Sequence, residues 1–124
     1  MPVNVLIVDD SGVMRRMIKR TLGMTGLVLG EIKEAPDGQA GLEEVRSGDF
    51  DLALVDVNMP RMNGLEMITK MREEALQVPV VVVSTEGSDD RIEWLRGNGV
   101  AFVPKPFTAE GLVDAVVKVF GGRL

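Results

Sequence analysis

The chain has 124 residues, of which 45% are hydrophobic and 27% charged, the proportions of a globular protein that can bury a core. It contains no cysteine and no histidine, which excludes disulfides, thiolate and histidine metal sites, a cysteine nucleophile and phosphohistidine. The net charge of −5 argues against direct nucleic-acid binding. With neither a membrane-length apolar run nor a signal-peptide pattern, we expect one cytoplasmic domain over residues 1–124, without membrane insertion or an output domain.

Short apolar runs alternate with longer amphipathic segments along the chain. Four of these runs are rich in β-branched residues and almost wholly apolar, which is typical of strands covered on both faces of a sheet. They are Val3 to Val8, Leu52 to Val55, Val80 to Val83 and Val100 to Val103. A weaker fifth strand is predicted between Leu27 and Glu34, interrupted by Gly30.

The intervening segments carry apolar residues at helical spacing, and most begin at a capping residue. The first helix is predicted to start at Asp10 or Ser11 and the second at Asp37, with Gly41 inside it at a cost of about 1 kcal/mol relative to alanine. Later starts are predicted at Asn63 and Ser88. Five strands alternating with five helices predict an α/β fold, a doubly wound five-stranded parallel sheet in a single domain.

Polar residues directly follow the predicted strands. Asp9 and Asp10 follow the first strand, and Asp56 follows the third. In such sheets, ligands bind outside the carboxyl ends of the strands. Three converging carboxylates repel one another unless a cation joins them, and hard oxygen ligands without histidine or cysteine suit Mg²⁺. The pattern therefore predicts a magnesium site at this edge of the sheet.

Two further residues fall at the same edge. Lys105 follows the last strand and offers an ammonium group, and Ser84 ends the fourth strand and offers a hydroxyl. A carboxylate nucleophile, a metal, an ammonium and a hydroxyl suit phosphoryl transfer, in which positioning and charge neutralisation dominate. Each residue alone has a simpler explanation as a helix cap, a turn residue or a solvated charge, but together they occupy four strand ends on one predicted edge.

In their order and spacing, five segments resemble the CheY-like receiver domains of two-component response regulators. The segments are VLIVDDSGVMRRMI, EAPDGQAGLEEV, DLALVDVNMPRMNGLEMI, VVVVST and VPKPF. The resemblance spans almost the whole chain. It implies a signalling protein that accepts a phosphoryl group from a sensor histidine kinase or a histidine phosphotransfer protein and then binds an output partner, in chemotaxis-like or phosphorelay signalling.

The resemblance also implies a role for each residue at the mouth of the sheet. Asp56 would be the phospho-acceptor, and Lys105 would contact the phosphoryl group. Asp10 would bind Mg²⁺, or Mn²⁺, directly, and Asp9 would assist through water. Asp56 and the backbone carbonyl of Asn58 would supply the remaining protein ligands.

The switching residues are likewise implied by the resemblance. Ser84 would move toward the phosphoryl group. Phe102 would be the aromatic residue that reports the state of the face formed by the fourth helix, fifth strand and fifth helix. Phe102 lacks a tyrosine hydroxyl, so its switching would depend on packing. The Lys105–Pro106 peptide bond would be cis.

Asn58 and Glu86 stand two residues after the acceptor and two after the switch hydroxyl, positions that tune dephosphorylation in the family. The pair predicts a short-lived phosphoryl group. One rival interpretation is a phosphohydrolase of the haloacid dehalogenase type, but that chemistry requires a general acid where Asn58 stands. The other is a receiver-like binding module that is never phosphorylated, although this chain keeps every acidic residue and the lysine.

Overall fold

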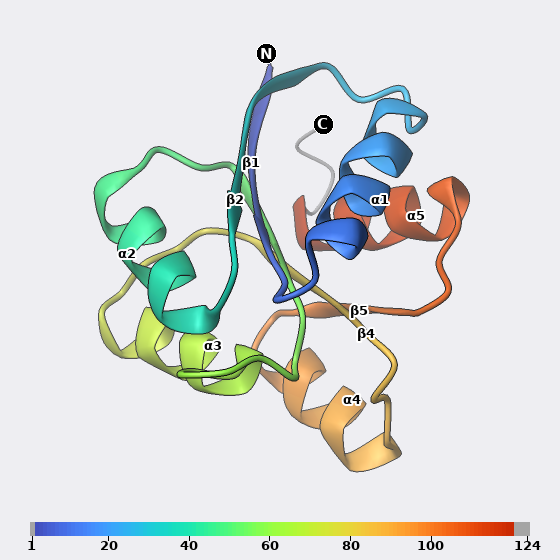
Figure 1. The fold of residues 1–124 in the computed structure, drawn as a ribbon. Coiled ribbons are helices and arrows are strands. Elements are labelled where there is room, and N and C mark those ends of the chain that lie inside the picture. The colour runs from blue at the N-terminus through green and yellow to red at the C-terminus, as the bar shows by residue number, and fades with distance from the viewer. Residues whose placement is uncertain (1, 121–124) are drawn as a thin grey trace.

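The computed structural model describes residues 2–120, in which five parallel strands form one sheet with helices on both faces (Figure 1). The strands lie in the order β2-β1-β3-β4-β5. The predicted doubly wound α/β fold is therefore confirmed. In chain order the elements are β1 (Val3–Val8), α1 (Gly12–Gly23), β2 (Leu29–Ala35), α2 (Gly38–Ser47), β3 (Leu52–Val55), α3 (Gly64–Glu73), β4 (Val80–Ser84), α4 (Asp89–Gly97), β5 (Ala101–Pro104) and α5 (Ala109–Phe120).

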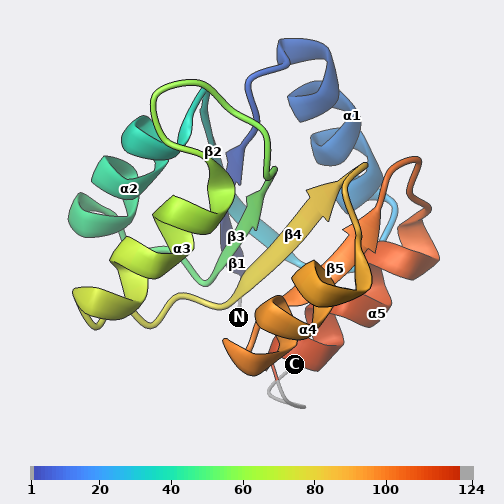
Figure 2. The same ribbon diagram turned by 90° about the horizontal axis from the view of Figure 1, so that it is seen from below.

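Helices α2, α3 and α4 cover one face of the sheet, and α1 and α5 cover the other (Figure 2). Successive side chains of a strand point to opposite faces, so Leu6 and Val8 of β1 pack in the cluster built with α2, α3 and α4. Val5 and Ile7 pack in the cluster built with α1 and α5. Both faces are therefore dry, which explains why the strand sequences are almost wholly apolar.

The helix starts follow the capping residues of the sequence. Ser11, rather than Asp10, is the N-cap of α1, where its side chain accepts a hydrogen bond from the Met14 backbone N–H. Asn63 and Glu66 form a reciprocal capping box at the start of α3. Asp37 and Ser88 cap α2 and α4. Within residues 2–120, no helix is both long and apolar enough to cross a membrane.

Two strand predictions need correction. β2 reaches Ala35, and Gly30 lies inside it rather than interrupting it. The register against β1 shifts by one residue there, and the Asn4 side chain accepts a hydrogen bond from the Glu31 backbone N–H. β5 begins at Ala101 and not at Val100, because the Val100 N–H still donates to a carbonyl of α4.

Gly41 lies inside α2, as predicted, but its role is steric. A Cβ atom at this position would lie 2.8 Å from a methyl carbon of Val8 and 3.1 Å from Cε of Met67. Only a hydrogen atom fits between α2 and the end of β1 at these distances. The glycine thus lets α2 approach the end of β1, which Asp9 directly follows. The helix-propensity cost predicted from the sequence therefore omits the main effect of this glycine.

Candidate functional site

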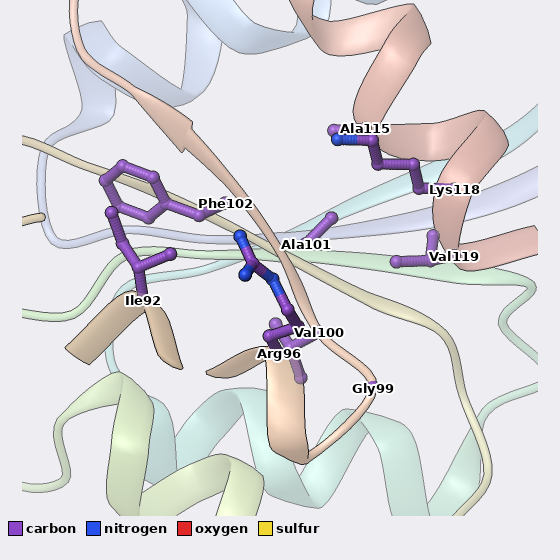
Figure 3. Close-up of a pocket in the computed structure, with 9 residues that line it drawn as sticks. All are labelled: Ile92, Arg96, Gly99, Val100, Ala101, Phe102, Ala115, Lys118 and Val119. Atoms are coloured by element: carbon purple, nitrogen blue, oxygen red, sulfur yellow. The ribbon is translucent and has the colours of Figure 1, made fainter. Parts of the chain in front are cut away.

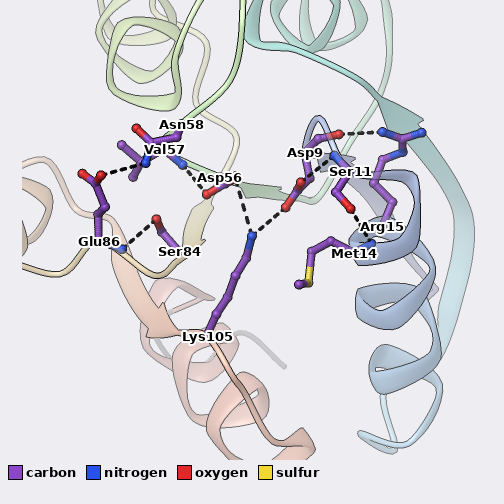
Figure 4. Close-up of polar contacts among 10 residues, drawn as sticks. All are labelled: Asp9, Ser11, Met14, Arg15, Asp56, Val57, Asn58, Ser84, Glu86 and Lys105. Atoms are coloured by element: carbon purple, nitrogen blue, oxygen red, sulfur yellow. Dashed lines mark hydrogen bonds and ion pairs between the residues drawn. The ribbon is translucent and has the colours of Figure 1, made fainter.

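The carboxyl ends of four neighbouring strands bring the predicted site residues together (Figure 4). Asp9 follows β1, Asp56 follows β3, Ser84 ends β4 and Lys105 follows β5. Val8 of β1 pairs in register with Val55 of β3, so the next residue of each strand, an aspartate, emerges at the same edge. The register of the parallel strands thus sets the position of the site.

The three carboxylates at this edge lie close to one another. One oxygen each from Asp9, Asp10 and Asp56 lies within 4.8 Å of the other two. Asp9 and Asp56 are buried, whereas Asp10 is exposed. This set of hard oxygen donors, without histidine or cysteine, fits a divalent cation such as Mg²⁺.

Lys105 supplies the positive charge on the buried side of the cluster. Its Nζ lies 3.0 Å from Oδ2 of Asp9 and 3.5 Å from Oδ2 of Asp56, and its side chain is 12% exposed. The peptide bond between Lys105 and Pro106 is cis, as the resemblance to receiver domains implies. The cluster therefore combines three carboxylates with one paired ammonium group, which leaves negative charge for a cation to neutralise.

Burial raises the pKa of the Asp56 carboxyl group above its ordinary value of 3.8. The nearby Lys105 ammonium lowers this pKa, whereas the charge of Asp9 raises it further. Oδ1 of Asp56 accepts a hydrogen bond of 2.8 Å from the Val57 backbone N–H. One oxygen of the carboxylate is thus fixed by the backbone, while the other faces the lysine.

Ser84 is buried beside the acidic cluster, and its hydroxyl oxygen accepts a hydrogen bond of 3.1 Å from the Glu86 backbone N–H. The Glu86 side chain lies over Asn58, whose amide nitrogen donates to Oε1 at 2.9 Å. Asn58 and Arg91 both donate to Glu86 and lower its pKa. The structure thus brings the two predicted dephosphorylation-tuning residues into direct contact.

Two arginines at this edge were not predicted as site residues. Arg15 of α1 donates to the Asp9 backbone carbonyl at 2.6 Å and pairs with Glu34 at 2.9 Å. Arg91 of α4 pairs with Glu86 at 2.5 Å. In the sequence, Arg15 is one of four cations of α1, with Arg16, Lys19 and Arg20, and no motif links it to the Asp9 carbonyl. The pairing of Arg91 has no periodic signal, because the glutamate lies in the loop before the helix.

Phe102 of β5 lies away from the acidic cluster, at a cavity of about 290 Å³ between α4, β5 and α5 (Figure 3). Its half-buried ring packs closely against Gly87 in the β4–α4 loop, where a Cβ atom would lie 2.7 Å from Cζ of Phe102. Phe102 therefore contacts the loop that follows Ser84 and also lines the α4-β5-α5 face. The cavity is lined by Ile92, Arg96, Gly99, Val100, Ala101, Phe102, Ala115, Lys118 and Val119.

Comparison with known proteins gives the same family from sequence and from structure. Residues 5–117 match the response regulator receiver domain. The chemotaxis protein CheY of Pseudomonas aeruginosa is 39% identical over 124 residues, covering 95% of this chain and 96% of that protein. CheY4 of Vibrio cholerae superposes with a TM-score of 0.81 at 31% identity, covering 96% of this chain and 99% of that one. A chain of the CheX–CheY–BeF3–Mg²⁺ complex of Borrelia burgdorferi gives 0.87 at 25% identity, with 97% and 90% covered. The chain belongs to the response regulator receiver family and is homologous to CheY.

Proposed function

We propose that Asp56 accepts a phosphoryl group and that this event changes the affinity of the α4-β5-α5 face for an output partner. The observation that carries the proposal is the buried Asp56 carboxylate, with the Lys105 ammonium 3.5 Å away in a cluster of three acids. A general phosphate-ester hydrolase is not favoured, because Asn58 stands two residues after the nucleophile and its amide is bonded to Glu86.

The acidic cluster has the donors that a divalent cation requires. Receiver domains bind Mg²⁺ at an acidic pocket, and here Asp10 would bind Mg²⁺ or Mn²⁺ directly, Asp9 through water, and Asp56 and the Asn58 carbonyl as further ligands. The bound ion would neutralise charge between the carboxylates and the incoming phosphoryl group. Asp10 is the exposed carboxylate of the three, so an ion that enters from solvent would reach Asp10 first.

Phosphoryl transfer requires a carboxylate oxygen of Asp56 to attack phosphorus in line with the leaving group. The donor is a phosphohistidine or a small acyl phosphate, so its P–N or P–O bond breaks as the new P–O bond to Asp56 forms. The Val57 N–H, bonded to Oδ1, limits rotation of the carboxylate. Lys105 lies close enough to pair with an oxygen of the phosphoryl group, because it already approaches Oδ2 of Asp56.

The switch would begin at Ser84. Its hydroxyl accepts a bond from the Glu86 N–H, and a phosphoryl oxygen on Asp56 offers it a stronger, charged acceptor. Movement of the β4–α4 loop would shift Gly87, against which the Phe102 ring packs. A phosphoryl group shifts the equilibrium between two states only through its different contacts in each state. Ser84 and Lys105 would supply that difference.

The test is phosphorylation by acetyl phosphate with Mg²⁺, followed by intact mass. We expect the wild-type protein to gain one phosphoryl group and Asp56→Asn to gain none, because the amide is not a nucleophile for this transfer. Addition of EDTA should prevent the gain. A wild-type mass that stays unchanged while a control receiver is labelled would contradict the proposal.

The physiological donor would be a sensor histidine kinase or a histidine phosphotransfer protein, and the output would be chemotaxis-like or phosphorelay signalling. Homology to CheY supports a histidine kinase upstream and a protein partner downstream. Capture of partners with and without beryllofluoride, on wild type and Asp56→Asn, would identify the partner. Binding that increases with beryllofluoride only in the wild type is the expected result.

A further inference from the structure

A chain of three side chains joins the acceptor loop to α4. The Asn58 amide nitrogen donates to Oε1 of Glu86 at 2.9 Å, as Figure 4 shows. Nη1 of Arg91 donates to Oε2 of the same carboxylate at 2.5 Å. Each oxygen of Glu86 is therefore bonded to a different element, one to the loop that follows Asp56 and the other to a helix.

The bond to Glu86 determines which atom of the Asn58 amide can accept a hydrogen bond from water. An asparagine amide has an NH₂ group that only donates and an oxygen that only accepts. With Nδ2 bonded to Glu86, Oδ1 is the atom that can accept a hydrogen bond from water. Asn58 stands two residues after Asp56, so this acceptor lies on the loop that leaves the phospho-acceptor.

Arg91 is better anchored than the glutamate that it holds. Its side chain is 27% exposed, whereas that of Glu86 is 50% exposed. Its backbone N–H donates to the Ser88 N-cap at the start of α4. A glutamate in an exposed loop samples several rotamers, and a charge-assisted bond to an arginine on a helix restricts that freedom.

We propose that Arg91 is a positioning residue for the loss of the phosphoryl group from Asp56, acting through Glu86 on the amide of Asn58. The inference rests on the proposed function. In this hydrolysis, the oxygen of a water molecule bonds to phosphorus. The bond between phosphorus and the Asp56 oxygen breaks, and its electron pair restores the carboxylate. Inorganic phosphate leaves and the water proton passes to solvent. Oδ1 of Asn58 holds the attacking water in line only while Nδ2 is tied to Glu86.

The measurement is the decay of phosphorylated protein, followed by intact mass after the acetyl phosphate has been removed, with Mg²⁺ present. We expect Arg91→Ala to lose its phosphoryl group roughly 3- to 10-fold more slowly than the wild type, because the amide of Asn58 is then free to turn. Arg46→Ala is the matched control. It removes an ion pair of the same 2.5 Å length, which joins α2 to Glu74 at the C-terminal end of α3, and its decay should match that of the wild type.

A double-mutant cycle separates action through Glu86 from a general effect on folding. If Arg91 acts through Glu86, Arg91→Ala should cause no further slowing in a Glu86→Ala background. Arg91→Lys, which keeps the charge, should restore part of the wild-type rate. Decay of Arg91→Ala at the wild-type rate, or equal slowing in both backgrounds, overturns the proposal.

The experiment distinguishes failure of this inference from failure of the proposed function. Absence of any phosphoryl gain on wild-type protein refutes the function itself, whatever Arg91 does. Normal labelling of all variants with identical decay refutes only the role of Arg91. Thermal unfolding of each variant provides the control for folding. If the unfolding midpoint of a variant is close to that of Arg46→Ala, a changed decay rate is not a consequence of partial unfolding.

Discussion

The two ends of the sheet both carry aspartates, but their environments differ. At the amino end, the exposed Asp51 accepts a hydrogen bond of 2.9 Å from the Asn4 backbone N–H. The Asn4 side chain also donates to the Asp49 carbonyl and accepts from the Glu31 N–H. At the carboxyl end, Asp9 and Asp56 are buried next to each other, with Lys105 as their shared counter-charge.

The difference shows which acidic cluster has a structural role and which is suited to chemistry. At the amino end the carboxylate is in water and its backbone partner is satisfied, so no further ligand is required. At the carboxyl end, two buried carboxylates share one ammonium, which stabilises neither fully. A cation, or a phosphoryl group with its metal, can lower the free energy of the site at the carboxyl end. At the amino end, binding a cation would bring no comparable stabilisation.

The largest expected effect is the loss of the shared counter-charge. Lys105→Met should lower the free energy of unfolding by about 3–5 kcal/mol in EDTA, because Asp9 and Asp56 are then buried without a counter-charge. Urea unfolding provides the measurement, and added Mg²⁺ should recover part of the loss. Asn4→Ala at the amino end should cost only about 1 kcal/mol, because solvent replaces the lost hydrogen bonds.

Lys70→Met controls for the loss of a lysine as such. Lys70 and Glu73 form an exposed pair at 3.7 Å, and removing such a pair changes stability by less than about 1 kcal/mol. Equal losses for Lys105→Met and Asn4→Ala would show that the two ends of the sheet are electrostatically alike.

The next effect is steric. A Cβ atom on Gly64 would lie 2.1 Å from the backbone oxygen of Asp56, so Gly64→Ala must push α3 away from the acceptor loop. We expect a loss of about 2–3 kcal/mol in the free energy of unfolding. At the amino end of the sheet, Gly23 has no atom within 4 Å of such a Cβ, and Gly23→Ala should be neutral or stabilising by up to about 1 kcal/mol.

Chemical or thermal unfolding of the two glycine variants provides the measurement, and phosphorylation by acetyl phosphate adds a second one. Gly64→Ala should also label more slowly, because the loop that carries Asp56 moves with the helix. A Gly64 variant as stable as the wild type would mean that the acceptor loop tolerates displacement.

The main parts of the fold and site were predictable because they depend on simple regularities. Apolar runs of strand length, alternating with helices, predict a parallel sheet, and parallel strands expose their carboxyl ends at one edge. Asp9, Asp56 and Lys105 each directly follow a strand, so their proximity follows from topology alone. Ser11 and Asn63 were recognisable because capping is a local effect of the residue itself.

The features that sequence reasoning missed depend on distances between segments. The contact of Gly41 with Val8 depends on how closely α2 approaches β1, so helix propensity alone misjudged that glycine. The pairing of Arg91 with Glu86 crosses from a helix to the preceding loop, and no periodic pattern encodes it. The register shift at Gly30 coincides with a hydrogen bond from the Glu31 N–H to the Asn4 side chain, a contact between two strands that no local pattern encodes.

The smallest effect concerns the charge on Asp56 itself. Burial raises the pKa of its carboxyl group above 3.8, so between 3.8 and the higher folded value the folded protein binds more protons than the unfolded chain. Stability then falls as pH rises through this window, and above it the ionised carboxylate is a constant penalty. Asp56→Asn removes that penalty. In EDTA at neutral pH, its unfolding midpoint should lie slightly above that of the wild type.

The pH dependence of the difference between the two proteins is the sharper measurement. The stabilisation by Asp56→Asn should shrink as the pH falls through the window and vanish well below 3.8, where the wild-type carboxyl group is protonated in both states. Mg²⁺ should reverse the order by stabilising the wild type more than the variant. Asp51→Asn at the amino end should bring no gain in the same EDTA buffer, because its carboxylate is exposed and already bonded to the Asn4 N–H. If Asp56→Asn is no more stable than the wild type in EDTA, Lys105 alone balances the charge of both buried carboxylates. The carboxyl end would then have no excess negative charge for a cation to neutralise.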